Sequence, residues 1–123
     1  MKAKDLMIGD WVLFDHNPVR VAILGAAKDS LGLAVGDNVF GQPYNMIEPI
    51  PLTAEILEKN GFDMDDYTVH FKEDEHYMLE LVFEDDELKW TINCNEYTIM
   101  NFEYVHELQH ALRLCKIDKE IVL

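Results

Sequence analysis

Apolar and polar residues alternate from Tyr67 to Met100, and this period of two constrains the fold more than any other feature of the sequence. Such alternation places one face of a β-strand in an interior and the opposite face in water. Short polar segments interrupt it, and connections of that length join neighbouring antiparallel strands. The pattern therefore predicts a four-stranded antiparallel meander, with strands over residues 67–71, 77–83, 88–92 and 97–99.

The first fifty residues follow a different pattern, in which short apolar stretches are separated by turn-forming residues. Five strands are predicted, over residues 11–14, 19–24, 31–35, 39–40 and 46–50. We expect glycine corners at Gly9, Gly25, Gly32, Gly36 and Gly41, and a further turn at His16, Asn17 and Pro18. Strands this short and this closely punctuated indicate a small, strongly bent sheet, which we interpret as an SH3-like β-barrel.

Two helices complete the predicted fold. Residues 49–52 contain two prolines, which cannot donate to a β-ladder, so we expect an extended connector there. A helix follows, with Thr53 as its N-cap and Gly61 in the left-handed position after its end. The last helix has Asn101 as its N-cap. Its apolar stripe is expected to pack on the meander and consists of Tyr104, Val105, Leu108, Ala111, Leu112 and Cys115.

The fold class predicted from these elements is α+β. Residues 1–52 form an SH3-like β subdomain, and residues 53–123 form a helix, a β-meander and a C-terminal helix, with one continuous domain as the alternative. The tail over residues 117–123 ends in three apolar residues and is interpreted as an additional edge strand.

The chain of 123 residues carries ten basic and twenty-four acidic side chains, for a formal net charge of −14. The excess lies in the second half: residues 1–52 hold four basic and six acidic side chains, whereas residues 53–123 hold six and eighteen. A surface this negative repels phosphate, which disfavours direct binding to nucleic acid. It permits attraction to a basic protein partner, although solubility is the more common reason for such a charge.

The remaining bulk features concern the cellular compartment. The two cysteines, Cys94 and Cys115, do not form a disulfide framework, and the start of the chain lacks the pattern of a secretion signal. No apolar run is long enough to span a membrane. We therefore expect a cytoplasmic protein with reduced thiols and no membrane partner.

One segment has the form of a catalytic motif. Residues 106–110 read H-E-x-x-H, which places His106 and His110 on one helical turn as zinc ligands with Glu107 as general base. A catalytic zinc needs a third protein ligand, and only Asp118 and Glu120 follow as candidates. The apolar stripe also predicts that both histidines lie on the solvent face, together with Gln109 and Arg113. We therefore interpret the match as coincidental and expect no metal site.

Other reactive residue types lack the context that their chemistry requires. Carboxylates at Asp63, Asp65 and Asp66 do not fit a calcium loop and are interpreted as solvated loop residues. His70 and His76 flank a predicted hairpin turn, and neither cysteine has a basic neighbour that would activate it. We expect no cofactor and no catalytic residue.

The segment Pro49-Ile50-Pro51-Leu52-Thr53 resembles part of an uncharacterised small-protein family of Bacteroidetes genomes and their phages or mobile elements. The start of the chain, with Ile8-Gly9-Asp10, and the helix around Tyr104-Val105-His106 are similar to that family as well. The resemblance implies no assigned activity or cofactor. The family pattern holds His106 and Gln109 consistently but Glu107 and His110 only in some members, which implies that the zinc-protease match arose by chance.

Taken together, the sequence predicts a non-enzymatic protein-interaction module, associated with phages or mobile elements, whose partner is a protein with a basic surface. Two alternatives from other classes stay open. One is a zinc-dependent hydrolase that uses His106, Glu107 and His110. The other is an acidic DNA mimic, which requires carboxylates spaced like phosphates along one face.

Overall fold

The structure is a computed structural model that describes residues 5–27, 29–65, 68–71, 77–84, 87–94, 97–114 and 119–123. The chain divides into two compact units, which we describe separately. The N-terminal unit comprises Met1–Pro51 with Tyr104–His106, and the C-terminal unit comprises Leu52–Glu103 with Glu107–Leu123. The fold is α+β, with antiparallel sheets and two α-helices, as predicted. Whether residues 1–52 and 53–123 are separate domains stays a prediction.

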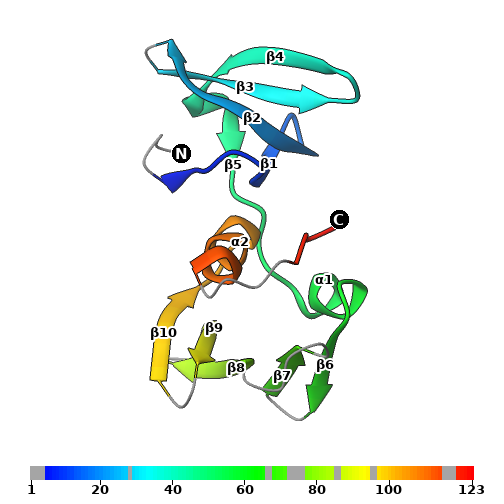
Figure 1. Cartoon of the computed structure of the whole chain (residues 1–123), viewed down its shortest axis with the longest axis vertical. Helices are drawn as coiled ribbons and strands as arrows, with labels where there is room; N and C mark the ends of the chain where they lie inside the picture. The colour runs from blue at the N-terminus through cyan, green and yellow to red at the C-terminus, as the bar shows by residue number, and fades with distance from the viewer. Residues whose placement is uncertain are drawn as a thin grey trace. The chain divides into compact units, whose positions relative to one another are not determined.

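The N-terminal unit contains a five-stranded antiparallel sheet with the strand order β4-β3-β2-β1-β5 (Figure 1). Its strands are β1 (Trp11–Phe14), β2 (Asn17–Ala27), β3 (Ser30–Val35), β4 (Asn38–Pro43) and β5 (Ile47–Glu48), with a short 3-10 helix at Tyr44–Met46. The five predicted strands are therefore present. The sheet is not closed within the described part of the chain, so the predicted barrel is not confirmed.

The predicted turns need two corrections. The β1–β2 turn consists of Asp15 and His16 alone, because Asn17 and Pro18 already pair with β1. Gly32 and Gly41 are not corners: they lie directly opposite each other in β3 and β4. At Gly32 a side chain would collide with Val39 and Ile23, whereas Gly25 and Gly36 have the positive φ that a predicted corner requires.

The core of the N-terminal unit is formed by alternate residues of β1, β2 and β3, as the period of two requires. Its buried members are Leu6, Val12, Val19, Val21, Leu31, Leu33 and Ile47. Asp10 is fully buried, and its carboxylate accepts a hydrogen bond from the backbone N–H of Met7 at 2.7 Å. The backbone carbonyl of Asp10 accepts a hydrogen bond from the N–H of Val21. These bonds fix the approach of the chain to the first strand.

The C-terminal unit begins with helix α1 (Ala54–Lys59), whose ends are those predicted. The Thr53 side chain accepts the N–H of Ile56 at 3.3 Å, and Gly61 has a φ of 85°. Both observations agree with N-capping by threonine and a left-handed glycine after the helix.

A second antiparallel sheet follows, with the order β10-β9-β8-β7-β6. Its strands are β6 (Phe62–Asp65), β7 (Thr68–Phe71), β8 (Tyr77–Glu84), β9 (Glu87–Cys94) and β10 (Tyr97–Phe102). The predicted meander is present, but it has five strands and not four. Asp63 and Asp65 belong to β6, so the interpretation of these acids as loop residues is wrong.

Helix α2 (Val105–Leu114) begins later than predicted, because Asn101 belongs to β10 and is not the N-cap. The carboxylate of Glu107 accepts the backbone N–H of Glu103 at 3.1 Å, just before the helix. The predicted stripe residues Val105, Leu108, Ala111 and Leu112 are all buried, whereas Cys115 lies outside the described residues. Packing of the stripe on the meander stays a prediction.

The end of the chain is not an edge strand, contrary to prediction: residues 119–123 have no regular secondary structure. The side chain of Asn60 holds this segment instead. Its amide donates to the carbonyl oxygens of Ile56 and Val122, both at 2.8 Å, and its oxygen accepts the N–H of Val122 at 2.7 Å. Ile121 in this segment is buried.

Candidate functional site

The H-E-x-x-H motif lies in helix α2, but its residues have other roles. His106 is buried, with 5% of its surface exposed, and its ring stacks on Tyr104 at a centroid distance of 5.9 Å. Gln109 is buried as well. The prediction that these two side chains lie in solvent is therefore wrong. The buried arc of the helix is wider than its apolar stripe, since amphipathic side chains extend it.

The other two motif residues do not complete a metal site. The Glu107 carboxylate is engaged at the start of the helix, where the helix dipole stabilises a negative group. His110 is half-buried. Among the residues that the structure describes, no group of three or more His, Cys, Asp or Glu side chains is arranged to hold a metal ion.

The remaining residues singled out from the sequence are dispersed. His70 lies in β7 and Cys94 in β9, while Asp66, His76 and Cys115 lie outside the described residues. Among the described candidates, His70 and Cys94 therefore lie on different strands and are not part of helix α2.

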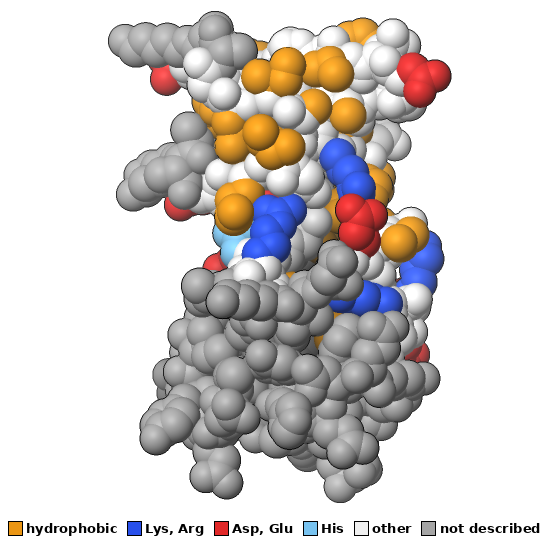
Figure 2. Space-filling model, in the orientation of Figure 1, with side chains coloured by type: hydrophobic (Ala, Val, Ile, Leu, Met, Phe, Trp, Pro, Cys, Tyr) orange, Lys and Arg blue, Asp and Glu red, His pale blue; other side chains and the backbone are white. Residues whose placement is uncertain are grey.

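The N-terminal unit carries a concentration of exposed apolar side chains that the sequence pattern does not predict. Figure 2 shows hydrophobic side chains gathered on the visible face of this unit. Seven large hydrophobic residues of the unit are exposed, namely Met7, Ile8, Ile23, Val35, Val39, Phe40 and Met46. Exposed apolar surface in such a concentration is typical of an interaction site.

Strand β4 stands out within this surface because it is an edge strand without charge. Its sequence is NVFGQP, and it pairs only with β3 among the described strands. Val39 is 52% exposed and Phe40 is 49% exposed. The six pairs between β3 and β4 run without a register shift, so the edge is regular. A regular, uncharged edge presents backbone N–H and C=O groups to a further strand.

The other sheet edges carry features that block such pairing. Strand β5 has only two residues, β6 carries Asp63 and Asp65, and the pairing of β10 is interrupted by a register shift between Thr98 and Met100. On β4 the only residue of a type that blocks pairing is Pro43, at the end of the strand. The signal in the sequence is the lack of any charged residue over 38–43 in a chain that is 28% charged.

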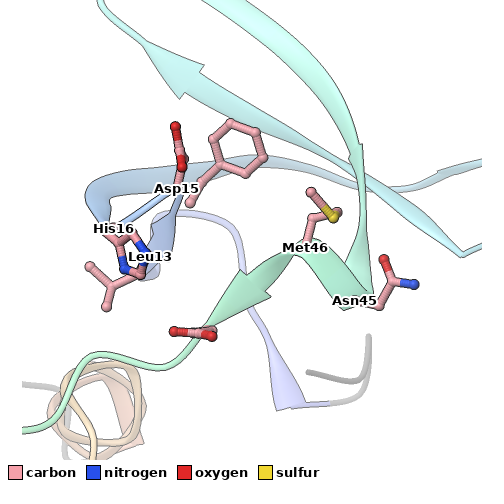
Figure 3. A pocket seen from close by; sticks show the side chains of 7 residues that line it. Leu13, Asp15, His16, Asn45 and Met46 are labelled. Carbon is pink, nitrogen blue, oxygen red and sulfur yellow. The ribbon is translucent and has the colours of Figure 1, made fainter.

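A pocket with a volume of about 450 Å³ lies elsewhere in the N-terminal unit. The lining residues come from two segments, which the pairing of β1 with β5 brings together: Leu13, Phe14, Asp15 and His16 from one, and Asn45, Met46 and Glu48 from the other. Figure 3 shows Leu13 and His16 on one side and Met46 on the other. The lining therefore combines apolar side chains with two carboxylates and includes no Lys or Arg.

The turn that forms part of this pocket is conformationally costly. Asp15 and His16 both have positive φ, 50° and 62°, in a two-residue hairpin turn that favours Asn-Gly. Each non-glycine residue in this left-handed conformation lowers the free energy of unfolding by roughly 1 kcal/mol. An Asn-Gly turn would be more stable at this position, yet the sequence has Asp15 and His16 there, whose side chains line the pocket.

We expect His16→Gly to raise the free energy of unfolding by about 1 kcal/mol, because glycine adopts positive φ without steric cost. Urea denaturation of the full chain measures this change. The control is Asn17→Gly at the next position, which is extended in β2 and whose side chain donates to the carbonyl of Asp15. That variant is expected to lose stability, so a gain in both variants would contradict the argument.

Comparisons with known proteins found no match: no protein-family model, no curated protein and no solved structure is significantly similar to this chain. The resemblance noted from the sequence therefore stays a prediction. In the part of the chain that the structure describes, neither helix has the length and apolar character needed to cross a membrane.

Proposed function

We propose that this protein is a non-enzymatic interaction module that binds an extended segment of a partner protein by adding it as a strand to β4. The observation that carries the proposal is the regular, uncharged and exposed edge of β4. In this mode of recognition, backbone hydrogen bonds supply affinity, and alternate side chains supply specificity. The strand order β4-β3-β2-β1-β5 supports the further proposal that the N-terminal sheet is SH3-like.

The face of the sheet beside this edge suits close approach of a second chain. Gly32 and Gly41 form a cross-strand pair, and a Cβ atom at Gly41 would meet no atom within 4 Å. The exposed side chains of Val39 and Ile23 flank Gly32 on that face. An incoming strand therefore finds backbone N–H and C=O groups at the edge of β4 and, next to them, the apolar side chain of Val39.

The charge of the chain favours one class of partner. Two copies of a chain with a net charge of −14 repel each other at long range, which disfavours pairing of β4 with the same strand of a second copy, although residues 1–52, which contain β4, contribute only −2 of that charge. A segment with Lys or Arg among its apolar residues is attracted by the same field. We therefore propose a basic protein segment as the occupant of the edge.

A displayed library of random short peptides, selected on the full-length protein, tests this proposal. We expect the selected peptides to alternate apolar residues with Lys or Arg and to bind with an affinity that falls as salt is raised. On binding, those backbone amides of residues 38–42 that point away from β3 should become protected from hydrogen exchange, because strand addition engages them in hydrogen bonds. Selection of acidic peptides, or protection confined to other strands, would contradict the proposal.

We expect Val39→Lys to weaken binding of a selected peptide about tenfold, because an edge lysine hinders strand addition. Fluorescence anisotropy with a labelled peptide measures the change. Ile23→Lys is the matched control: Ile23 is also an exposed apolar residue, but it lies on the inner strand β2 and should change affinity less than about threefold. Equal losses in both variants would indicate docking on the face of the sheet and would overturn edge binding.

A further inference from the structure

We infer that the pocket between the β1–β2 turn and β5 binds the side chain of a lysine or arginine residue of a protein. This site is separate from the β4 edge, and either proposal can fail without the other. The inference rests on the chemistry of the lining, in which two carboxylates accompany three apolar side chains.

The carboxylates determine the sign of the charge that a ligand of this pocket carries. Asp15 and Glu48 both line the pocket, both are exposed, and they come from segments that are far apart in the sequence. None of the seven lining residues is Lys or Arg. A cation that enters the pocket gains attraction from both carboxylates, whereas an anion is repelled.

The apolar lining sets the shape of the ligand. Leu13 and Phe14 are half-buried, and Met46 is exposed at the opposite wall. The stems of lysine and arginine are apolar and end in a cation, so they cover such a wall while the charged end stays near the carboxylates. The aromatic ring of Phe14 adds a surface on which a guanidinium or ammonium group is favoured. The volume of about 450 Å³ leaves room for such a side chain.

The strain of the turn supports the same assignment. Asp15 and His16 occupy positive φ at a cost to stability, and Asn-Gly in their place would remove one of the two carboxylates and one wall of the pocket. A turn that keeps these side chains despite the cost is expected where the side chains bind a ligand.

The test uses n-butylguanidinium and n-butylammonium as probes, with n-pentanol as an uncharged probe of similar size. Each is titrated into the isotope-labelled full-length protein and followed by NMR. We expect both cations to cause saturable shifts at residues 13–16 and 45–48, and to bind at least about fivefold more tightly than the alcohol. Equal affinity for the alcohol, or no saturable shift with any probe, would overturn the inference.

Two substitutions locate the charge effect. Asp15→Asn and Glu48→Gln should each weaken binding of the cations about fivefold and leave binding of n-pentanol within about twofold. The control is Asp37→Asn, which removes an exposed charge of the same unit outside the pocket and should change affinity less than about twofold. A loss at Asp37→Asn as large as that at Asp15→Asn would mean that only the overall charge acts, and the proposed site would be wrong.

Unfolding of a variant cannot mimic these results. The double variant Asp15→Asn with His16→Gly is expected to be more stable than the natural chain, because the resulting pair suits the turn. It should nevertheless bind the cations about fivefold less tightly. Retention of full affinity in this stabilised variant would contradict the assignment of Asp15.

Discussion

Substitution of Asn60 by alanine is expected to lower the free energy of unfolding by about 3 kcal/mol, because it removes three hydrogen bonds at once and leaves partly buried backbone groups without partners. Asn60 is buried and joins the end of helix α1 to the last residues of the chain. Urea denaturation measures the loss, and hydrogen exchange measures its location. We expect the amide of Val122, which donates to the Asn60 oxygen, to lose protection first.

Two further variants test whether the loss of stability comes from the hydrogen bonds of Asn60 and not from the removal of an asparagine as such. Asn38→Ala removes an exposed asparagine of β4 and should change stability by less than about 0.5 kcal/mol. Asn60→Asp keeps the acceptor for the N–H of Val122 but replaces the amide donors by an oxygen that faces two carbonyl groups. Its loss should approach that of the alanine variant. A loss below about 1 kcal/mol in Asn60→Ala would refute a clamping role for this side chain.

The elements that the sequence predicts well are those in which local chemistry and tertiary packing agree. The strand Trp11–Phe14 has the predicted bounds, and the cap at Thr53 and the glycine at Gly61 have the predicted geometry. Each of these rests on interactions within a few residues, so a single sequence contains the necessary information.

The incorrect predictions concern residues whose polarity and whose position in the apolar pattern indicate different environments. Phe62 and Met64 alternate with Asp63 and Asp65, which is the period of a strand, but the acids favoured a loop. They are compatible with a strand because β6 is an edge of its sheet. His106 shows the reverse case: its polar ring was assigned to solvent, yet stacking on Tyr104 accompanies its burial.

The candidate sites could not be derived from the sequence for a different reason. Leu13 and Glu48 meet only because β1 pairs with β5, and no local pattern specifies that pairing. The β4 edge depends on the strand order as well, since an uncharged strand in the middle of a sheet would not be exposed. Topology, more than residue type, therefore decides which side chains are able to meet a partner.

The glycine pair of the N-terminal sheet gives the second large effect. Gly32→Ala is expected to lower the free energy of unfolding by about 2 kcal/mol, because a Cβ atom there would lie 2.9 Å from Val39 Cγ1 and 3.0 Å from Ile23 Cβ. The Val39 side chain is exposed and rotates away easily, but the Cβ atom of Ile23 moves only with the backbone of β2. Thermal and urea denaturation of the full chain measure this loss.

Gly41→Ala is the matched control, because Gly41 lies directly opposite Gly32 and a Cβ atom there would meet nothing within 4 Å. This substitution restricts the unfolded chain without a clash, so it should leave stability unchanged or raise it by up to about 1 kcal/mol. The two substitutions would then change stability in opposite directions, because Ile23 lies against Gly32 and not against Gly41. If both alanine variants were equally stable, the close packing of Ile23 on Gly32 would be refuted, and with it the flat apolar face next to the β4 edge.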